Sequence, residues 1–314
     1  MKLKLNEFNF NNLFILYQKK KMSQQKSKTL RLVYPQWQGG INPNYATGSE
    51  ILNLILPKGG PQTEILEVPV EKDFSKEGVV DNGIYEESTL INQLQCAYNI
   101  LQTKNPDKVI TLGGDCSISQ PAFDFLHGKY PDKTCIIWLD AHPDISSPEI
   151  GWKNEHAMVL GNLLGDGAKN FANIVKNKFK YEQVMYGGLI KEKLLPHEEK
   201  YLQEKKIKYA VPNELKDNSD KIINWIKENG FKQALIHLDL DVLSPKLFRS
   251  LLCNEPNLPT PDYAIGTMEL KDIVRIIVDI SKEIKLVGFS IAEYMPWDII
   301  NMRKEFSKVD IFKD

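Results

Sequence analysis

Short apolar runs alternate with longer segments of helical periodicity from residue 29 onward, and this alternation restricts the fold more than any other feature of the chain. Eight runs rich in Val, Ile and Leu have the length of strands, and helix-like stretches lie between them. A repeated order of strand and helix predicts an α/β fold with a mostly parallel sheet covered by helices on both faces. The expected strands are 30–35, 65–70, 109–114, 135–141, 183–189, 208–212, 234–242 and 285–294, and the expected helices include 85–104, 117–129, 156–165, 218–229 and 268–282.

The composition excludes several classes of partner. The 314 residues carry 40 basic and 41 acidic side chains, so the charge creates no long-range field that would gather nucleic acid or an anionic membrane. No run of 18 apolar residues occurs, which excludes an ordinary transmembrane helix. The four cysteines are widely spaced without a CxxC pair, which indicates reduced thiols and a cytoplasmic protein.

The N-terminal segment differs from the rest of the chain. Its apolar run, Leu13 to Tyr17, is too short for the core of a signal peptide, and no small-residue cleavage site follows. Because Met22 opens the stretch "MSQQKSKTL", a start site placed too far upstream is one interpretation and a disordered or loosely helical tail is the other. We assign residues 1–27 to such a tail and residues 28–314 to a single α/β domain.

Polar side chains follow the apolar run of "IIWLDAHPDISSPE", residues 136–149. Alternation places Asp140, His142 and Asp144 on one side, where two carboxylates and an imidazole can converge on a hard divalent ion. In sheets of this type ligands gather at the carboxyl ends of the strands. A capped turn is the alternative, because Asp-Pro and Ser-Ser-Pro clusters are ordinary loop chemistry. Three ionisable groups at the end of a buried strand are costly unless paired or metal-bound, which favours the metal site.

A second strand end carries two carboxylates. In "ALIHLDLDVLSP", Asp239 and Asp241 share one face of an apolar strand, and a cation beside them would relieve their repulsion. His237 falls on the same face, but a lone histidine early in a strand is more typical of a hydrogen-bonded core residue, so we do not expect it to be a ligand. Glu293 at a third strand end and His156 at the start of a helix are weak signals by themselves.

Taken in order over about residues 109–296, these segments resemble the ureohydrolase family, which includes arginase, agmatinase and formimidoylglutamase. "GGDCS" is similar to the family's Gly-Gly-Asp-His-Ser segment, "DAHPD" to Asp-Ala-His-x-Asp, "DLD" to Asp-x-Asp, and "EYMP" to Glu-x-x-Pro. "HAMVLGNLLGDG" resembles the helix opening that carries the family's catalytic-site histidine. The resemblance implies a three-layer αβα fold around an eight-stranded parallel sheet, in agreement with the strand count.

The resemblance also implies a metal centre. Asp140 and Asp239 would bridge two Mn²⁺ ions, His142 and Asp241 would complete the shell of one ion, and Asp144 would contribute to the other. In the family the two metals make a nucleophile from water at neutral pH.

Two further residues would act on the substrate, a small guanidino or amide compound. Glu293 would hold the positive charge of the guanidinium, and His156 would transfer a proton to the leaving amine. Relatives commonly form trimers or hexamers, so the resemblance implies a homo-oligomer.

Cys116 stands where the family has a histidine ligand, and two interpretations remain open. A thiolate at a helix start could bind a softer ion such as Zn²⁺ or Fe²⁺ better than Mn²⁺, whereas a neutral buried thiol would leave that ion weakly bound or absent. The second case leaves Asp140, His142 and Asp239, a cluster that resembles the single-zinc site of deacetylase-like amidohydrolases. A metal-poor relative with a regulatory or structural role is the third possibility.

The loop after the metal motif differs from that of arginases. In arginases this loop holds the carboxylate of the amino acid with Asn, Ser and Asn residues. Here Ser146 and Trp152 stand at the nearest positions, and of the original residues only Asn154 is retained. Of the acidic pair that contacts the α-amino group, only Glu198 lies in a comparable place. We therefore expect Ser146, Asn154 and Glu198 to contact a substrate other than arginine.

Overall fold

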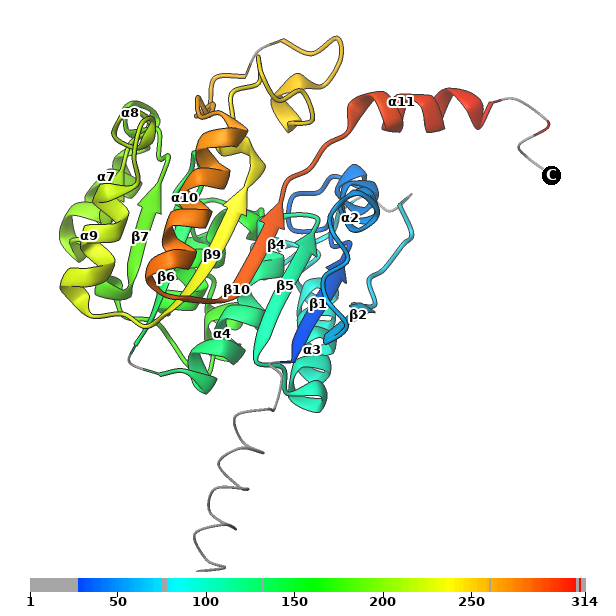
Figure 1. Ribbon diagram of the computed structural model, residues 1–314. Helices are drawn as coiled ribbons and strands as arrows, with labels where there is room; N and C mark the ends of the chain where they lie inside the picture. Colours follow the sequence, from blue (N-terminus) through cyan, green and yellow to red (C-terminus); the bar gives the residue numbers. More distant parts are fainter. Residues whose placement is uncertain (1–27, 75–77, 132, 260, 309–310, 312–314) are drawn as a thin grey trace, which may run out of the picture.

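A single eight-stranded sheet forms the centre of the molecule, and every pairing between its neighbouring strands is parallel (Figure 1). The computed structural model describes residues 28–74, 78–131, 133–259, 261–308 and 311, so the predicted tail, 1–27, lies outside the described residues. The sheet order is β2-β1-β5-β10-β9-β6-β7-β8. All eight expected strands are confirmed, as β1 Thr29–Tyr34, β2 Thr63–Glu67, β5 Lys108–Gly113, β6 Thr134–Leu139, β7 Val184–Gly187, β8 Lys208–Ala210, β9 Gln233–Asp239 and β10 Lys285–Ala292.

Helices cover both faces of the sheet, as the alternating pattern predicts (Figure 1). One hydrophobic core contains side chains of α3, α4, α5 and α7, and a second core on the opposite face contains side chains of α2, α9 and α10. This is the predicted three-layer αβα arrangement. The helices are α2 Asn44–Ile55, α3 Glu87–Lys104, α4 Ser119–Lys129, α5 Val159–Leu164, α6 Lys169–Ile174, α7 Pro196–Lys205, α8 Pro212–Leu215, α9 Asp220–Asn229, α10 Leu270–Glu283 and α11 Trp297–Phe306, and a small hairpin pairs β3 Val80–Asp81 with β4 Ile84–Tyr85.

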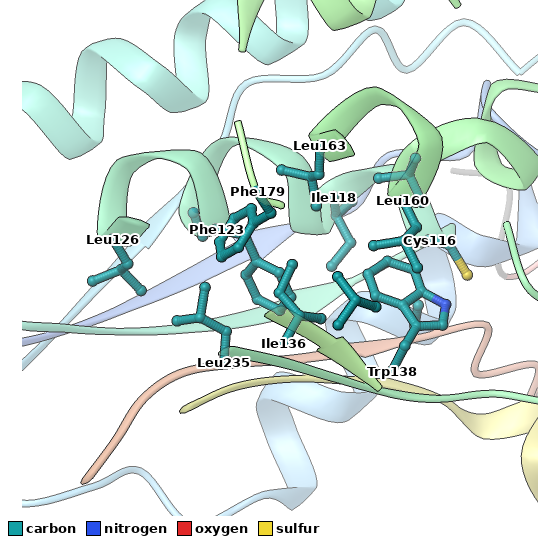
Figure 2. Packing of buried hydrophobic residues seen from close by; sticks show 14 of the residues in the cluster. Cys116, Ile118, Phe123, Leu126, Ile136, Trp138, Leu160, Leu163, Phe179 and Leu235 are labelled. Atoms are coloured by element: carbon teal, nitrogen blue, oxygen red, sulfur yellow. The ribbon is translucent and has the colours of Figure 1, made fainter. Parts of the chain in front are cut away.

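Period-two alternation decides which side chains of a strand join which core. In β6, Ile136 and Trp138 belong to the core under α4, whereas Ile137 and Leu139 belong to the core under α9 and α10. Figure 2 shows Trp138 at the same end of the first core as Cys116. The next residue on the face of Trp138 is Asp140, so the polar strand end lies directly above this core.

Two of the expected helices begin with a tighter turn. A 3₁₀ segment, Cys116–Ile118, precedes α4, and its start is capped by the Asp115 side chain, which accepts a hydrogen bond from the Ser117 backbone N–H at 3.1 Å. Another 3₁₀ segment, Glu155–Met158, precedes α5. Both segments lie at the edge of the sheet where the strands end, so each helix starts at the predicted site.

The strand order brings four strand ends together. β5, β10, β9 and β6 are consecutive neighbours at the centre of the sheet, although they lie far apart in the sequence. Each of the three polar strand ends found in the sequence belongs to one of these strands, and Cys116 follows the fourth. Among the described residues, no helix has both the length and the apolar character that crossing a membrane requires.

Candidate metal centre

The predicted ligands meet at the carboxyl ends of the four central strands. One cluster, which we call the outer group, consists of Asp140, His142 and Asp241, and one ligand atom from each lies within 4.8 Å of the others. A second cluster, the inner group, consists of Cys116, Asp140, Asp144 and His237, with the same mutual limit of 4.8 Å. Asp140 belongs to both groups.

The outer group faces solvent on one side. His142 Nδ1 lies 2.9 Å from Asp241 Oδ2 and 3.5 Å from Asp140 Oδ1. The side chains of His142 and Asp241 are 31% and 23% exposed, whereas that of Asp140 is fully buried. Burial opposes a charge on His142, but the carboxylates of Asp241 and Asp140 raise its pKa well above the ordinary value. In the metal-free protein a proton on His142 therefore takes the place that a cation can occupy.

The inner group is buried and contains atoms without partners. Asp144 Oδ2 and His237 Nε2 have no hydrogen-bond partner among the described residues. Asp144 has a left-handed backbone, with φ 49°, and its carbonyl accepts hydrogen bonds of 3.1 Å from the N–H groups of Leu160 and Gly161. These bonds to the start of α5 hold a conformation that is uncommon for a residue other than glycine. A buried polar atom without a partner is costly, so these two atoms indicate a ligand position.

Asp239 connects the two groups. Its Oδ1 accepts a 2.6 Å hydrogen bond from the Asp241 backbone N–H, and its Oδ2 lies 2.9 Å from Cys116 Sγ. Burial and the nearby carboxylate of Asp239 raise the pKa of Cys116 well above its ordinary value. Without a metal, Cys116 is therefore a thiol that donates to Asp239. Cys116 Sγ also lies 3.8 Å from Glu293 Oε1.

The electrostatics of the site fit divalent cations. Burial and the charge of Asp241 raise the pKa of Asp140 from 3.8 to about 7. Burial and neighbouring carboxylates also raise the pKa values of Asp144 and Asp239 well above 3.8. A cation between such carboxyl groups would stabilise their charged forms, which burial and mutual repulsion disfavour. The oxygen and nitrogen donors suit Mn²⁺, Zn²⁺ or Fe²⁺.

Glu293 and His156, the two predicted catalytic residues, are in contact beside the inner group. His156 Nδ1 lies 3.1 Å from Glu293 Oε1. The Glu293 side chain is buried, and its backbone has φ 65° and donates a 2.8 Å hydrogen bond to the Gly114 carbonyl. The His156 side chain is 25% exposed, so this pair links the buried ligands with the solvent side.

One wall of the site was not expected from the sequence. The loop between β1 and α2 reaches the site, and Gly39 N donates a 2.9 Å hydrogen bond to the buried Asp115 carboxylate. A Cβ atom on Gly40 would lie 2.5 Å from the Tyr45 ring and 3.4 Å from His156 Nδ1, so a larger residue does not fit there. The adjacent glycines after the first strand were the available signal for this close approach.

The three predicted substrate-binding residues lie in different settings. Ser146 is buried, with 2% of its surface exposed, and Asn154 is half-buried just before the 3₁₀ segment that carries His156. Glu198 Oε2 accepts a 2.8 Å hydrogen bond from the Leu195 N–H, which caps the start of α7. Trp152 packs against a small hydrophobic cluster that includes Met158.

His237 is the ligand candidate that sequence reasoning set aside, and the structure brings it into the inner group. His237 Nδ1 is hydrogen-bonded within the core, as expected for a core histidine. The second ring nitrogen, Nε2, is the one that has no partner. Its orientation depends on neighbours from α4 and β10 that a single sequence does not place.

Comparison with known proteins gives a consistent set of relatives. The sequence model described as "Arginase family" matches residues 62–302. An arginase of Staphylococcus aureus (strain COL) is 27% identical over 184 residues, which are 57% of this chain and 59% of that protein, so the match spans somewhat more than half of either length. A second relative, an Entamoeba histolytica arginase, is 26% identical over 199 residues, 60% of this chain and 62% of that protein.

Solved structures share the fold over most of the chain. The Entamoeba histolytica arginase in complex with L-ornithine aligns with a TM-score of 0.71 at 19% identity, over 87% of this chain and 92% of that chain. A formimidoylglutamase from Bacillus subtilis aligns with a TM-score of 0.61 at 14% identity, over 87% of this chain and 81% of that chain. A putative agmatinase from Clostridium difficile aligns with a TM-score of 0.57 at 21% identity, over 90% and 93% of the two chains.

Proposed function

The chain belongs to the arginase family, and we propose that it is a metal-dependent hydrolase that cleaves a C–N bond in a small guanidino compound. The observation that carries this proposal is the pair of overlapping ligand groups that share Asp140 at the ends of adjacent strands. Hydrolysis of a guanidino group adds water to its carbon and releases urea and a primary amine. An unsubstituted amidine would yield ammonia and an amide by the same addition of water.

We assign the predicted ligands to two positions. His142 and Asp241 would hold one ion with Asp140, and Asp144 would contribute to the other, with Asp239 between the two. Bound divalent ions would supply a water nucleophile that is active at neutral pH. Mn²⁺ is the ion we expect, with Zn²⁺ or Fe²⁺ as alternatives.

The protein side chains around this position orient the substrate and move the proton. The buried Glu293 carboxylate would bind the guanidinium through charge-assisted hydrogen bonds, and its contact with His156 would bring the leaving nitrogen near the imidazole. Burial opposes a charge on His156, but Glu293 raises its pKa. A protonated His156 can therefore donate its proton to the leaving amine, as a general acid must.

We propose that the substrate lacks the α-amino acid head of arginine. The carboxylate and ammonium groups of that head need polar partners at the mouth of the site. Trp152 packs against apolar residues, the Ser146 side chain is buried, and the Glu198 carboxylate accepts a hydrogen bond at the start of α7, so these positions offer few exposed polar groups. Asn154 is half-buried, and one amide is a poor match for a zwitterion. Contacts of Ser146, Asn154 and Glu198 with the substrate remain predictions.

A substrate screen tests the function. The protein would be incubated with Mn²⁺, Co²⁺ or Zn²⁺ and with guanidino compounds with and without an α-amino acid head, linear amidines and N-acetylated amines. Urea, ammonia and acetate would be measured separately. We expect urea from a guanidino compound without the α-amino acid head and slower turnover of arginine. Efficient turnover of arginine would contradict the substrate assignment, and acetate release with one bound ion would instead indicate a deacetylase-like enzyme.

Matched variants test whether turnover depends on the proposed site. Asp140→Asn removes a carboxylate shared by both ligand groups and should abolish turnover. Asp107→Asn is the control, because Asp107 pairs with Lys129 on the surface, 2.9 Å from its Nζ, and belongs to neither group. Equal turnover by Asp140→Asn and the parent would rule out the proposed centre. The homo-oligomer and the cytoplasmic location remain predictions, and sedimentation of the purified protein checks the first.

A further inference from the structure

His237 lies one layer below the carboxylates of the site. It is two residues before Asp239 on β9, and in the sheet register it stands opposite Trp138 of β6 and Ser290 of β10. Period two places its side chain on the same face as Asp239. The side chain is fully buried, and its ring stacks on Trp138 with centroids 3.7 Å apart.

The hydrogen bonds of the ring permit a tautomer with the proton on Nδ1. His237 Nδ1 lies 2.8 Å from Ser119 Oγ and 3.2 Å from Ser290 Oγ. Ser119 Oγ donates its own proton to Ser290 Oγ at 2.8 Å, so it can accept one from Nδ1–H. With the proton on Nδ1, Nε2 carries a lone pair. An outer hydrogen bond of this kind on one ring nitrogen is the usual arrangement for a histidine that binds metal through the other.

Nε2 points to the inner group. It lies 3.9 Å from Asp140 Oδ2, and within the described residues it has no hydrogen-bond partner. Two atoms bound to one ion by bonds of about 2.1 Å at a tetrahedral angle are about 3.4 Å apart, so a shift of about 0.5 Å would place both on one ion. Packing against Trp138 explains the buried ring but leaves Nε2 unsatisfied.

We propose that His237 Nε2 is a ligand of the ion in the inner group, together with Asp140 and Asp144. It supplies the imidazole nitrogen that the sequence lacks at position 116, where the thiol of Cys116 instead donates to Asp239. The inference rests on the proposed metal-dependent function, because that function requires an ion at this position. Histidine at 237 on β9 thus compensates for cysteine at 116, which follows β5, two strands away in the sheet.

Metal counting on variants tests the ligand. Metal-free protein would be loaded with Co²⁺, freed of excess ion, and analysed for cobalt per chain and for its visible absorption. His237→Asn keeps an amide nitrogen near the place of Nδ1 but removes Nε2, whereas His237→Gln places an amide atom near Nε2. We expect about two ions per chain in the parent, about one in His237→Asn, and an intermediate, weaker second site in His237→Gln.

His127→Asn is the matched control. His127 is also buried, stacks on Phe179 with centroids 3.9 Å apart, and lies 2.8 Å from the Asn177 carbonyl through Nδ1. It belongs to neither ligand group, so its variant should keep about two ions. The control shows what the loss of a buried, stacked imidazole does by itself to folding and metal uptake.

A measurement on the parent protein covers the case in which the variants do not fold. X-ray absorption at the cobalt edge counts imidazoles per ion. In protein that holds about two ions per chain, His142 with His237 gives about one, whereas His142 alone gives about one half. Equal cobalt in the parent and His237→Asn, the value of one half, or only one cobalt per chain in the parent would overturn the proposal. If cobalt uptake follows the expectation while the substrate screen finds no turnover, the proposed function fails and the ligand assignment stands.

Discussion

Removal of the metal should make the folded protein lose stability as the pH rises from about 5 to 7. Burial raises the pKa of Asp140 to about 7 and those of Asp144 and Asp239 well above 3.8. In this pH range the metal-free folded state therefore holds protons that the unfolded chain has lost. Linkage then requires the free energy of unfolding to fall as the pH rises.

The size of this effect follows from the number of protons. Each extra proton on the folded state lowers the free energy of unfolding by about 1.4 kcal/mol per pH unit. The three raised carboxyl groups of the site favour the fall, and so do His142 and His156, whose pKa values are also raised. His237 opposes it with one proton below about pH 6.5, because burial lowers its pKa to about 3. One to two net protons give about 1.4 to 3 kcal/mol per pH unit, or roughly 3–6 °C in melting temperature.

Thermal unfolding with and without chelator measures the effect between pH 5 and 7. Bound divalent ions displace the protons of the ligand groups and stabilise the folded state, by about 2.7 kcal/mol at a hundredfold excess over the dissociation constant. The loaded protein should therefore have a shallower downward slope, to which Asp115 and Glu155 still contribute. Asp140→Asn should flatten the slope of the metal-free protein, and Asp107→Asn should leave it unchanged. A metal-free parent whose melting temperature rises over this pH range would refute the reasoning.

Three further predictions concern single residues of the site. Asp239→Asn should remove most of the bound metal, because Asp239 lies between the two groups, and metal analysis that finds the parent content would exclude its role. Cys116→Ser should keep both ions within about twofold in affinity, because a hydroxyl can also donate to Asp239; loss of one ion would identify the thiolate as a ligand. Gly40→Ala should lower kcat at least tenfold with little change in metal content, because its Cβ would lie 2.5 Å from Tyr45 next to His156, and unchanged kinetics would show that the loop yields freely.

The polar strand ends were predictable because each is a local signal. Burial of a carboxylate such as Asp140 or Asp239 at the end of an apolar strand costs free energy. These positions can be recognised in the sequence without knowledge of the fold. The three-layer arrangement was predictable for the same reason, since the alternation of strands and helices repeats along the chain. Which strands are neighbours depends on contacts between distant segments, and the central order β5-β10-β9-β6 was not deduced from spacing.

The role of His237 could not be predicted from its local sequence. Its position in the strand suggested a core residue, and the hydrogen bond to Ser119 agrees with that interpretation. The free Nε2 became visible only when α4, β6 and β10 were placed around it. Glu198 is a similar case, since the pattern of a proline followed by Glu198 two residues later describes the start of a helix as well as a substrate contact.

The central claim is that divalent ions lie at the ends of the four central strands. Anomalous diffraction from crystals of the protein grown with Mn²⁺ or Co²⁺ tests it most directly, because the signal locates each ion without reference to activity. We expect two peaks, one between Asp140, His142 and Asp241 and the other between Asp140, Asp144 and His237. Well-diffracting crystals with no peak beside Asp140 at saturating metal would contradict it.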